Sequence, residues 1–489
     1  MLQSVVGAGG KTSYIKQVAK EYVEKGLTVF VTTSTKMYVE EDTILSGNKD
    51  EILAHLEEKR YAMAGMSVSD MRAEERAEER SDGKNNSKYK DDRGEGEKFK
   101  SLPLDTFRSI CTHADVVLVE ADGSKHLPLK YPNESEPVLY EETDEIVIVC
   151  GMHALGKTVK EAVHRYELAC EHLRLQPETM IDAEIIQNIV RKAYMEPLKE
   201  KYPNKQIVIE PRGAVTLYER AAAALIKANY DVNLIRKEWF VSQPTLIICG
   251  GGHVSCELVK IASSLDFYIK VIDDREEFAN KERFPLAHEV ICDTFDHLEN
   301  YLESNAYYVV VTRGHKDDFV CVKTILGHSY QYLGMIGSKL KVEKTFENLE
   351  KEGINKEQIA SIFAPIGLKL GAVTPAEIAI SILAQIIQEK NKTHCASVSR
   401  ELLHAKEKGM LCIIIGKSGS SPRGVGSMML ITEDKIYDSI GGGAVEFAVI
   451  EDAKSCTEVM IREYHLNNKD SIRLGMICGG SNQVLFVPL

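Results

Sequence analysis

"LIICGGGHVSCELV", residues 246–259, decides the fold of the middle of this 489-residue chain. A short apolar run stops at three glycines and a histidine, and a helical pattern follows. The next apolar run, "YIKVID", ends at Asp273. This order is typical of a Rossmann-like unit, in which backbone N–H groups approach a phosphate and the acid holds a ribose hydroxyl. The alternative for Asp273 is an ion pair with Arg275 at the strand end.

A second strand end in the same block also carries polar side chains. The run "YYVVVT" is followed by Arg313, His315 and Asp318, at the edge where open α/β sheets bind ligands. His315 is either a proton carrier or a solvent-exposed histidine. We expect a phosphate-bearing cofactor, a dinucleotide or another, to contact the following residues: Gly250, Gly251, Gly252, His253, Asp273, Arg313 and His315.

Working outward, the chain divides into three blocks. Residues 1–240 alternate strands with helices, which predicts a P-loop-like domain with a parallel sheet. Residues 244–390 form the Rossmann-like domain, and residues 391–489 read as a small α+β domain built on hairpins. The overall fold class is therefore α/β. The stretch at about 68–101 is rich in charge and nearly free of apolar residues, so we expect a flexible insertion.

Two helices are expected in the second half of the chain. One begins at "TPAEIAISILAQIIQEK", with Thr374 as its N-cap and Pro375 in its first turn. The other covers "AVEFAVIEDAKSCTEVMIREY", residues 444–464.

Composition and charge limit the function. The net charge of -13 argues against nucleic-acid binding, which needs a basic surface. No apolar run approaches the ~20 residues that span a bilayer, and no membrane association is expected. The eleven cysteines include no CxxC pair, and the start of the chain does not resemble an export signal. The sequence therefore predicts reduced thiols and a cytoplasmic location.

A first glycine loop, "VVGAGGKTS", lies at residues 5–13, between an apolar run and a helical pattern. Amides of Gly7, Gly9 and Gly10 at a helix N-terminus can cradle phosphates, Lys11 can reach β/γ oxygens, and Thr12 or Ser13 can ligate magnesium. Val5 stands where GxxxxGK[ST] has its first glycine, so this is a short variant of the P-loop. The alternative is a glycine-rich turn with a solvated lysine.

Two acids support the nucleotide interpretation. "DVVLVEADG" places Glu120 and Asp122 after an apolar run, where an NTPase keeps an acid that holds magnesium. The alternative for Asp122 is an Asp-Gly turn. We expect Thr12, Glu120 and Asp122 to hold the metal and Lys11 and Asp122 to be catalytic.

The third block offers a polar loop and a second glycine bend. Serine hydroxyls and an arginine fork suit an anionic head group, and three glycines before a helix form an amide nest. Glu446 in the first turn of that helix favourably faces its dipole. Cys478 is expected to be catalytic, as an exposed thiol that handles sulfur, selenium or metal. The alternative is a half-buried strand cysteine. The expected cofactor-binding residues are Ser420, Ser421, Arg423, Gly441, Gly442, Gly443 and Glu446.

The first block resembles the YqeC family of accessory proteins for selenium-dependent hydroxylases. The motifs are "GAGGKTS", "VTTSTKMY", "EADGSKHLPLKYPNESEP" and "GMHALGKTV" followed by "VHRYEL". The resemblance implies that one site is lined by Lys11, Thr12, Thr32, Thr33, Thr35, Lys36, Glu120, Asp122, Lys130, His164 and Arg165.

The other two blocks resemble the two halves of the XdhC/CoxI family, accessory factors for molybdenum hydroxylases such as xanthine dehydrogenase. "VVVTRGHKDD" and "YLGMIGSKLK" are similar to its Rossmann half, and "SSPRGVGSMML", "SIGGGAVE" and "MICGG" to its CoxI-type half. In familiar members the CoxI-type half comes first, so the order here is permuted. The halves are expected to meet across one interface; otherwise the third block works alone or in trans between subunits.

These resemblances imply a maturation factor for a molybdenum hydroxylase, in particular a selenium-dependent one. It would bind the molybdenum cofactor, as molybdopterin or its dinucleotide, and assist its sulfuration or selenation and its insertion. ATP or GTP with Mg²⁺ would occupy the first block, where NTPase activity stays open. The implied partners are the apo-hydroxylase and a sulfur or selenium donor such as a cysteine desulfurase, and a homodimer is compatible with this scheme.

Two other functions remain open. One is an NAD(P)-dependent oxidoreductase fused to a P-loop kinase. The other is a non-catalytic scaffold switched by its nucleotide state.

Overall fold

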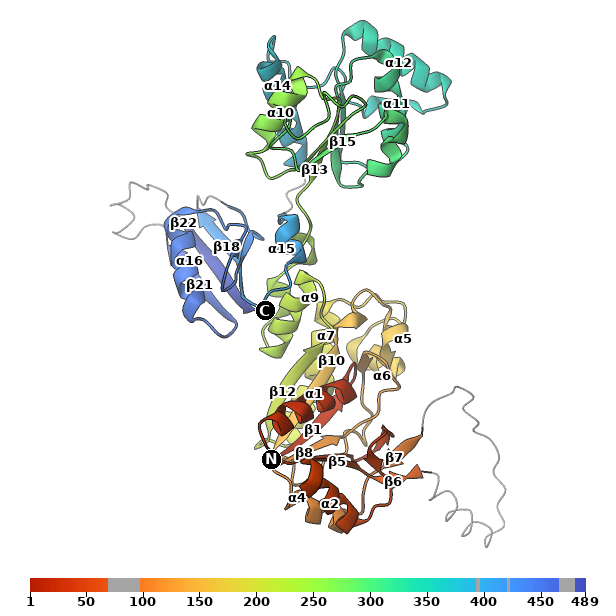
Figure 1. Ribbon diagram of the computed structural model, residues 1–489, viewed down its shortest axis with the longest axis vertical. Helices are drawn as coiled ribbons and strands as arrows, with labels where there is room; N and C mark the ends of the chain where they lie inside the picture. Colours follow the sequence, from red (N-terminus) through yellow and green to blue (C-terminus); the bar gives the residue numbers. More distant parts are fainter. Residues whose placement is uncertain (69–96, 393–395, 420–422, 466–479) are drawn as a thin grey trace.

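The computed structural model of the chain describes residues 1–68, 97–392, 396–419, 423–465 and 480–489. Its three main sheets are a seven-stranded and a five-stranded parallel sheet and a five-stranded antiparallel one, each with its own helices (Figure 1). The predicted α/β class is therefore confirmed. No helix among the described residues has the length and apolar character needed to cross a membrane.

The N-terminal domain is built on a seven-stranded sheet in which every pairing is parallel, in the order β12-β10-β1-β8-β2-β5-β4. Its central strands β1, β8 and β2 are buried at every position, as expected for strands covered on both faces. The strands are β1 (Leu2–Gly7), β2 (Val29–Thr33), β4 (Thr43–Ile44), β5 (Tyr61–Ala64), β8 (Val116–Glu120), β10 (Glu145–Gly151) and β12 (Gln206–Arg212).

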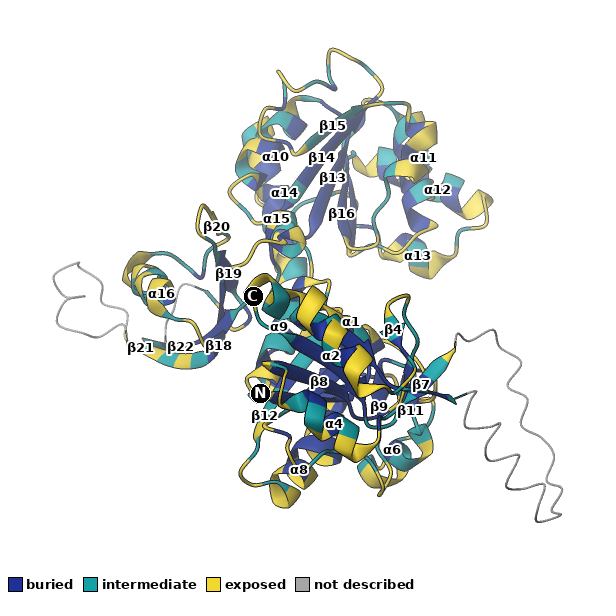
Figure 2. Ribbon diagram, turned by 60° about the horizontal axis from the view of Figure 1, so that its bottom comes forward, coloured by how far each residue is buried: buried dark blue, intermediate teal, exposed yellow. Residues whose placement is uncertain are grey.

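Helices cover both faces of this sheet (Figure 2). Alternate residues of one strand reach opposite faces: Val117 and Val119 pack with Ile52 and Phe107, while Leu118 packs with Ile15. The helices are α1 (Lys11–Glu24), α2 (Lys49–Lys59), α4 (Leu104–Cys111), α5 (Val159–Ala162), α6 (Tyr166–Leu173), α7 (Ala183–Ile189), the π-helical turn η2 (Val190–Met195), α8 (Glu196–Lys201) and α9 (Leu217–Lys227); short 3₁₀ turns are η1 (Met152–Ala154), η3 (Val232–Leu234) and η4 (Lys237–Trp239).

Two small sheets flank the carboxyl edge of the large one. The first is antiparallel and pairs β3 (Lys36–Tyr38), β7 (Lys98–Lys100) and β6 (Met66–Ser67). The second pairs β9 (Leu129–Lys130) with β11 (Val163–His164). Strand β7 belongs to the stretch predicted as a flexible insertion, so that prediction is wrong for its end; residues 69–96 lie outside the described residues.

The middle domain has a five-stranded parallel sheet in the order β15-β14-β13-β16-β17. Helices α10 and α14 cover one face, and α11 and α12 the other. The strands are β13 (Thr245–Cys249), β14 (Tyr268–Asp273), β15 (Glu289–Cys292), β16 (Ala306–Val310) and β17 (Tyr332–Met335). The helices are α10 (His253–Ala262), η5 (Phe295–Tyr301), α11 (His315–Leu326), α12 (Lys339–Lys351), α13 (Lys356–Ala360) and α14 (Pro375–Lys390).

The predicted start of the last of these helices is confirmed. The Thr374 side chain accepts a hydrogen bond from the backbone N–H of Glu377, the Glu377 side chain returns one, and Pro375 lies in the first turn.

The C-terminal domain is an antiparallel sheet in the order β20-β19-β18-β22-β21, with α16 on one face. The expected helix over 444–464 is too long: α16 ends at Ser455, and Met460–His465 is an edge strand paired with β22. The strands are β18 (Met410–Gly419), β19 (Met428–Ile431), β20 (Ile436–Tyr437), β21 (Met460–His465) and β22 (Gly480–Pro488), and the helices are α15 (Arg400–His404) and α16 (Gly443–Ser455).

The C-terminal domain packs on the N-terminal domain rather than on the glycine edge of the Rossmann-like domain. The sheet face opposite α16 shares one apolar core with α9 and α15, through Leu411, Leu485 and Leu225 among others. Arg220 of α9 donates to the backbone oxygens of Ala405 and Glu407, at 2.7 and 2.6 Å. Figure 1 shows α9 and α15 between the C-terminal domain and the other two.

Candidate functional site

The first glycine loop joins β1 to α1 in a conformation that needs glycine. Gly7, Gly9 and Gly10 have φ of 92, 85 and 126°, which L-residues rarely adopt. A Cβ at Gly7 would lie 2.1 Å from the backbone oxygen of Val149, and one at Gly9 2.5 Å from that of Pro128. The bend therefore presents backbone without side chains at the carboxyl edge of the sheet, directly before the first turn of α1.

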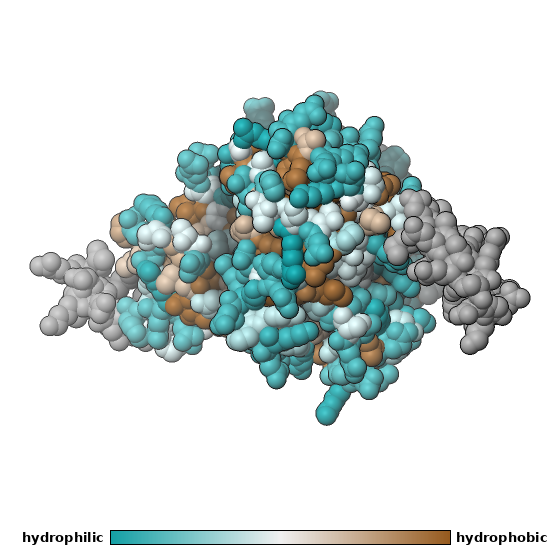
Figure 3. Space-filling model, turned by 90° about the horizontal axis from the view of Figure 1, so that it is seen from below, coloured by the Kyte–Doolittle hydropathy of each residue, from teal (hydrophilic) through white to brown (hydrophobic). Residues whose placement is uncertain are grey.

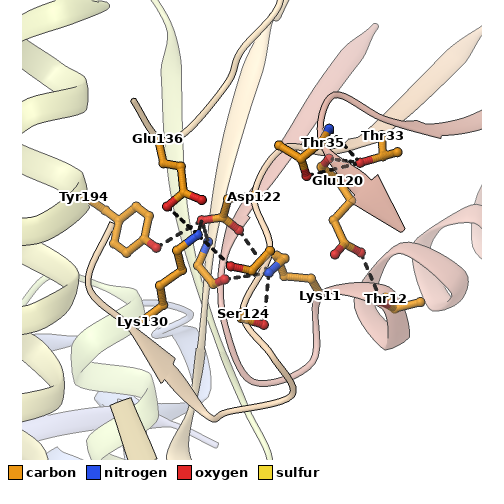
Figure 4. A network of polar contacts seen from close by, with 12 residues as sticks. Lys11, Thr12, Thr33, Thr35, Glu120, Asp122, Ser124, Lys130, Glu136 and Tyr194 are labelled. Atoms are coloured by element: carbon orange, nitrogen blue, oxygen red, sulfur yellow. Dashed lines mark hydrogen bonds and ion pairs between the residues drawn. The ribbon is translucent and has the colours of Figure 1, made fainter. Parts of the chain in front are cut away.

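Lys11 is the first residue of α1 and its side chain is buried. Its Nζ lies 2.7 Å from the backbone oxygen of Gly7, 3.0 Å from Asp122 Oδ1 and 3.4 Å from Ser124 Oγ (Figure 4). The lysine is thus folded against its own loop and held by a carboxylate behind it.

Asp122 is fully buried behind the loop, where it organises its neighbours. Its Oδ2 accepts hydrogen bonds from the N–H of Gly7 at 3.0 Å and from the hydroxyl of Tyr194 at 3.1 Å, and lies 3.5 Å from Lys130 Nζ. The pKa of Tyr194 is raised, mainly by burial and next by the nearby Asp122 carboxylate. Asp122 was expected to be catalytic and to hold metal, and this stays a prediction. In the structure its contacts hold the loop and both lysines in place.

Glu120 and Thr12 are neighbouring side chains whose oxygens can still bind a metal ion. Thr12 donates to Glu120 Oε2 at 3.0 Å. Burial raises the pKa of Glu120, against the lowering influence of Lys11 and Thr12, and no described cationic side chain forms an ion pair with it. No group of three or more His, Cys, Asp or Glu residues in the described ranges is placed to hold a metal. A hydroxyl and one carboxylate suit Mg²⁺, which usually keeps waters and phosphate oxygens as its other ligands.

A cleft of about 900 Å³ opens over this bend. It is lined on the glycine side by Gly9, Gly10, Lys11, Thr12, Ser13, Glu120, Gly123 and Ser124. The other lining residues, which we call the far wall, are Lys36, Tyr38, Glu40, Lys98, Lys125, His126, Leu127, Glu136, His153, His164 and Arg165. Most of the charged side chains on this list are basic, so the cleft suits an anionic ligand.

Glu136 links the cleft wall to the buried lysines. Its carboxylate pairs with Arg165 and, at 2.8 Å, with Lys130, whose side chain is fully buried. Burial alone would raise the pKa of Glu136, but hydrogen bonds from Arg165 and Lys130 outweigh it and lower the pKa to about 2. On the neighbouring strand β11, burial and then Arg165 lower the pKa of His164 to about 4, so its imidazole is neutral at pH 7.

The sequence-derived site is only partly assembled in the cleft. Thr32, Thr33 and Thr35 bind the chain itself: Thr32 donates to the backbone oxygen of Ala64 at 2.8 Å, and Thr33 to that of Glu120 at 2.7 Å. Thr33 Oγ1 also accepts the N–H of Thr35 at 3.0 Å. These threonines position the ends of β2 and β8 rather than line the cleft.

Several cleft residues were not predicted from the sequence. Tyr38, His126 and Glu136 lie within or beside the quoted motifs, so their polar side chains close to Lys36, Lys125 and Lys130 offered a signal. Tyr194, which is buried and does not line the cleft, comes from the π-helical turn η2, more than seventy residues from Asp122, and no local pattern indicated it.

The second glycine loop joins β13 to α10. A Cβ at Gly250 would lie 2.5 Å from the backbone oxygen of Val311, and a Cβ at Gly251 would lie 2.2 Å from that of Phe278. Asp273 is buried and accepts the N–H of Gly251 at 2.7 Å and two hydrogen bonds from the Arg275 guanidinium, at 2.8 and 2.9 Å. Burial opposes ionisation, but these bonds lower the pKa of Asp273. The ion pair considered as its alternative is therefore present, and the carboxylate is already occupied.

The remaining Rossmann candidates flank the point where the strand order reverses, between β13 and β16. Gly252 and His253 begin α10, and His315 begins α11. Arg313 reaches Asp274 at 3.4 Å. Asp318 is fully buried. Its carboxylate accepts a hydrogen bond from the Thr312 hydroxyl at 2.6 Å and forms an ion pair with Lys341.

The third glycine bend is filled by the chain's own carboxylate. Glu446 Oε2 accepts the N–H groups of Ile440 and Gly442, both at 3.0 Å, and the hydroxyl of Ser439. Burial opposes ionisation, but these bonds lower the pKa of Glu446. Gly441 and Gly443 complete the bend, with φ of 126 and 70°. The expected amide nest thus binds Glu446 rather than standing open for a head group.

The other candidates of that domain are dispersed. Arg423 pairs with Asp266 of the Rossmann-like domain at 3.2 Å. Ser420, Ser421 and Cys478 lie outside the described residues.

Fold and site together define a three-domain α/β protein with glycine-lined bends at the carboxyl edges of two parallel sheets. Comparison with known proteins gives the families: residues 3–167 match the YqeC protein, residues 246–386 the XdhC Rossmann domain and residues 402–463 the XdhC and CoxI family. The chain therefore carries a YqeC region followed by both XdhC-type regions, and the predicted resemblance is confirmed with the Rossmann region first.

Individual relatives agree with this assignment. YqeB of Escherichia coli is 33% identical over 30% of this chain and 28% of its own length. YqeC of Escherichia coli is 29% identical over 38% and 66% of the two chains. A probable xanthine dehydrogenase subunit from Bacillus subtilis is 27% identical over 31% and 44%. The chain thus spans less than half the length of YqeB and of the Bacillus subtilis protein.

Proposed function

We propose that this protein is an accessory factor for a molybdenum hydroxylase of the xanthine dehydrogenase type. The support is the pair of XdhC-type regions, together with the similarity to a protein called a probable xanthine dehydrogenase subunit. The partner in this proposal is the apo-hydroxylase.

We propose further that the N-terminal domain binds a nucleoside triphosphate with Mg²⁺. The observation that supports this most is the coincidence of side-chain-free backbone, Lys11 and the Thr12–Glu120 pair on one wall of a cleft of about 900 Å³. That volume lies within the roughly 300–1,000 Å³ typical of ligand sites.

Each residue of the cleft has a role in this proposal. The amides at Gly9 and Gly10 and the start of α1 hold phosphate oxygens. Lys11 exchanges its contact with the Gly7 oxygen for a phosphate oxygen, while Asp122 keeps its ammonium in place. Thr12 and Glu120 would hold Mg²⁺, which when bound neutralises charge on the phosphates. Arg165 adds positive charge from the far wall.

Single-turnover assays with ATP and GTP test whether this site hydrolyses its ligand or only binds it. Lys11→Ala is compared with Lys20→Ala, an exposed lysine on the same helix, and affinity is measured for every variant. Bound nucleotide that is hydrolysed by the wild type and by Lys20→Ala, and not by Lys11→Ala, supports an NTPase. Tight binding without turnover supports the nucleotide-switched scaffold.

For the Rossmann-like domain we propose a phosphate-bearing molybdenum cofactor, molybdopterin or its dinucleotide, at the bend of Gly250 to His253. The ion pair of Asp273 with Arg275 favours molybdopterin itself over NAD, because molybdopterin has no ribose and the acid that would hold a ribose hydroxyl is occupied. Equilibrium binding decides: tight NAD(H) binding without affinity for molybdopterin would support the oxidoreductase instead.

The sulfuration or selenation step, with a donor such as a cysteine desulfurase, belongs to the proposal on the strength of the YqeC and XdhC-type regions alone. Mass spectrometry of small molecules that co-purify with the protein under anaerobic conditions tests it. Recovery of a sulfurated or selenated pterin supports the step, and recovery of NAD(P) alone contradicts it.

A further inference from the structure

Two aromatic rings meet on the far wall of the N-terminal cleft. Tyr38 ends β3, and His126 lies in the turn after β8, 88 residues away. Their ring centroids are 5.0 Å apart at an interplanar angle of 29°, and His126 Nε2 lies 2.9 Å from the Tyr38 hydroxyl. We call these two side chains the ring pair. Both line the cleft, Tyr38 half-buried and His126 exposed.

The backbone that presents His126 is strained. Lys125 and His126 have φ of 48 and 59°, two consecutive non-glycine residues in the left-handed region. Residues other than glycine rarely adopt this backbone conformation. Where they do, the residues are often found at ligand sites, and surrounding contacts maintain the conformation. Here the strain places an imidazole over the Tyr38 ring at the mouth of the cleft.

The same turn contacts the phosphate end of the cleft. Ser124 Oγ lies 3.4 Å from Lys11 Nζ, and the backbone oxygen of Gly123 accepts Lys130 Nζ at 2.7 Å. Two residues later the chain reaches His126, and two residues span at most about 7 Å. One short segment therefore connects the phosphate-binding wall to the ring pair, at a separation that a nucleoside can bridge.

We propose that the ring pair is the subsite for the planar base of the bound nucleotide, and that it favours a purine. This inference rests on the proposed nucleotide site. A base stacks on the open face of the ring pair, and two fused rings cover more of it than one. Lys98 Nζ, 4.4 Å from the Tyr38 ring centroid, adds a cation to the same wall.

Binding of ATP, GTP, CTP and inorganic tripolyphosphate to four proteins tests the proposal: wild type, Tyr38→Leu, His126→Ala and the control His113→Ala, an exposed histidine outside the cleft. Tyr38→Leu and His126→Ala should lower the affinity for ATP and GTP roughly tenfold and leave the affinity for tripolyphosphate unchanged. Tyr38→Phe, which keeps the ring, should restore the affinity. Circular dichroism and thermal unfolding confirm that each variant is folded.

Three results would overturn the inference. Purine nucleotides bound equally by wild type and the ring variants would remove the stacking role. Equal loss of nucleotide and tripolyphosphate would assign the ring pair a structural role in the whole cleft. A wild type that binds tripolyphosphate as tightly as ATP would contradict the base subsite alone, whereas one that binds neither would also contradict the proposed nucleotide site.

Discussion

At the scale of single residues, the N-terminal site is organised by buried charges. Asp122 and Lys130 are fully buried, and Lys11 nearly so. Removing one partner of a buried ion pair is far more costly than removing both, because the remaining charge loses its compensation. The arrangement of Lys11 in front of Asp122, and of Lys130 between Asp122 and Glu136, therefore fixes where positive charge faces the cleft.

The first prediction concerns Glu136. Because its pKa falls from 4.5 to about 2 in the folded protein, its carboxylate stabilises the fold fully above pH 4.5, and this stabilisation is lost as the pH falls toward 2. Glu136→Gln should lower the free energy of unfolding by about 3 kcal/mol at pH 7. The difference from wild type should shrink steadily between pH 4.5 and 2.

Urea unfolding at several pH values measures this effect. Glu134→Gln is the matched control, since Glu134 is exposed and lies two residues away. A Glu136 variant with unchanged stability at pH 7, or with a deficit that does not depend on acid pH, would contradict the prediction.

The sequence indicated which residue types meet at this site, but not what each one does. Lys11, Thr12 and Glu120 were predicted together, because they follow strands whose carboxyl ends share one sheet edge. The ion pair of Asp273 with Arg275 was foreseen, but the contacts of Asp122, Asp273 and Glu446 with glycine-loop backbone were not, since only the folded chain brings these groups within reach. A spacing motif does not distinguish an acid that awaits a ligand from one that already binds its own loop.

At the scale of elements, the three glycine bends differ in what occupies them. Lys11 folds across the first, Asp273 binds an amide of the second, and Glu446 fills the third. Only the first of these bends opens into the large cleft described above.

The second prediction concerns the bend before α16. Glu446→Ala frees the N–H groups of Ile440 and Gly442 and should destabilise the C-terminal domain by about 1–3 kcal/mol. Since a vacated nest binds anions, inorganic phosphate should raise the thermal unfolding temperature of the variant more than that of wild type. An equal phosphate effect on both proteins would show that the nest does not hold an anion once Glu446 is removed.

Element boundaries show where sequence patterns fall short. The helix from Pro375 was predicted correctly, because its cap and first-turn proline are local signals. The helix expected over 444–464 was not, since "MIREYH" alternates half-buried and exposed residues along the edge of a sheet. Its partner strand β22 follows later in the chain, so non-local pairing overrides the local helical pattern.

At the scale of the whole molecule, the two XdhC-type domains meet at the wrong end for a shared site within one chain. Arg400 of α15 donates to Thr245 Oγ1 at 2.8 Å and to Glu303 at 2.7 Å, and its guanidinium lies 3.8 Å from the Tyr268 ring centroid. Thr245 and Tyr268 begin their strands, whereas the glycine bend lies at the far end of β13, about 16 Å away for five residues. The two halves therefore contact each other at the amino ends of β13 and β14, and not at the glycine edge.

The surface seen from the N-terminal end shows no large apolar face outside the residues drawn in grey (Figure 3). Figure 3 shows a largely hydrophilic surface in which hydrophobic residues form small, separate groups. No sequence pattern distinguished independent action of the two XdhC-type regions from action in trans between two copies of the chain.

The third prediction tests the junction between domains. Arg400→Ala removes both hydrogen bonds and the stacking on Tyr268, so the Rossmann-like domain should lose its fixed position while each domain stays folded. Hydrogen exchange should rise several-fold at Val398–His404 and stay unchanged at β1 and β16. Lys392→Ala, an exposed lysine of the same connection paired with Glu389, serves as the control, and equal exchange in both variants would contradict the role of Arg400.

The most direct test of the proposed nucleotide site is calorimetric titration of the intact protein with ATP and with GTP, with and without Mg²⁺, for wild type and Glu120→Gln. We predict saturable binding of at least one nucleotide to a single site, strengthened by Mg²⁺ in the wild type and indifferent to it in Glu120→Gln. No binding of either nucleotide at millimolar concentration, or an unchanged response to Mg²⁺ in Glu120→Gln, would contradict the site.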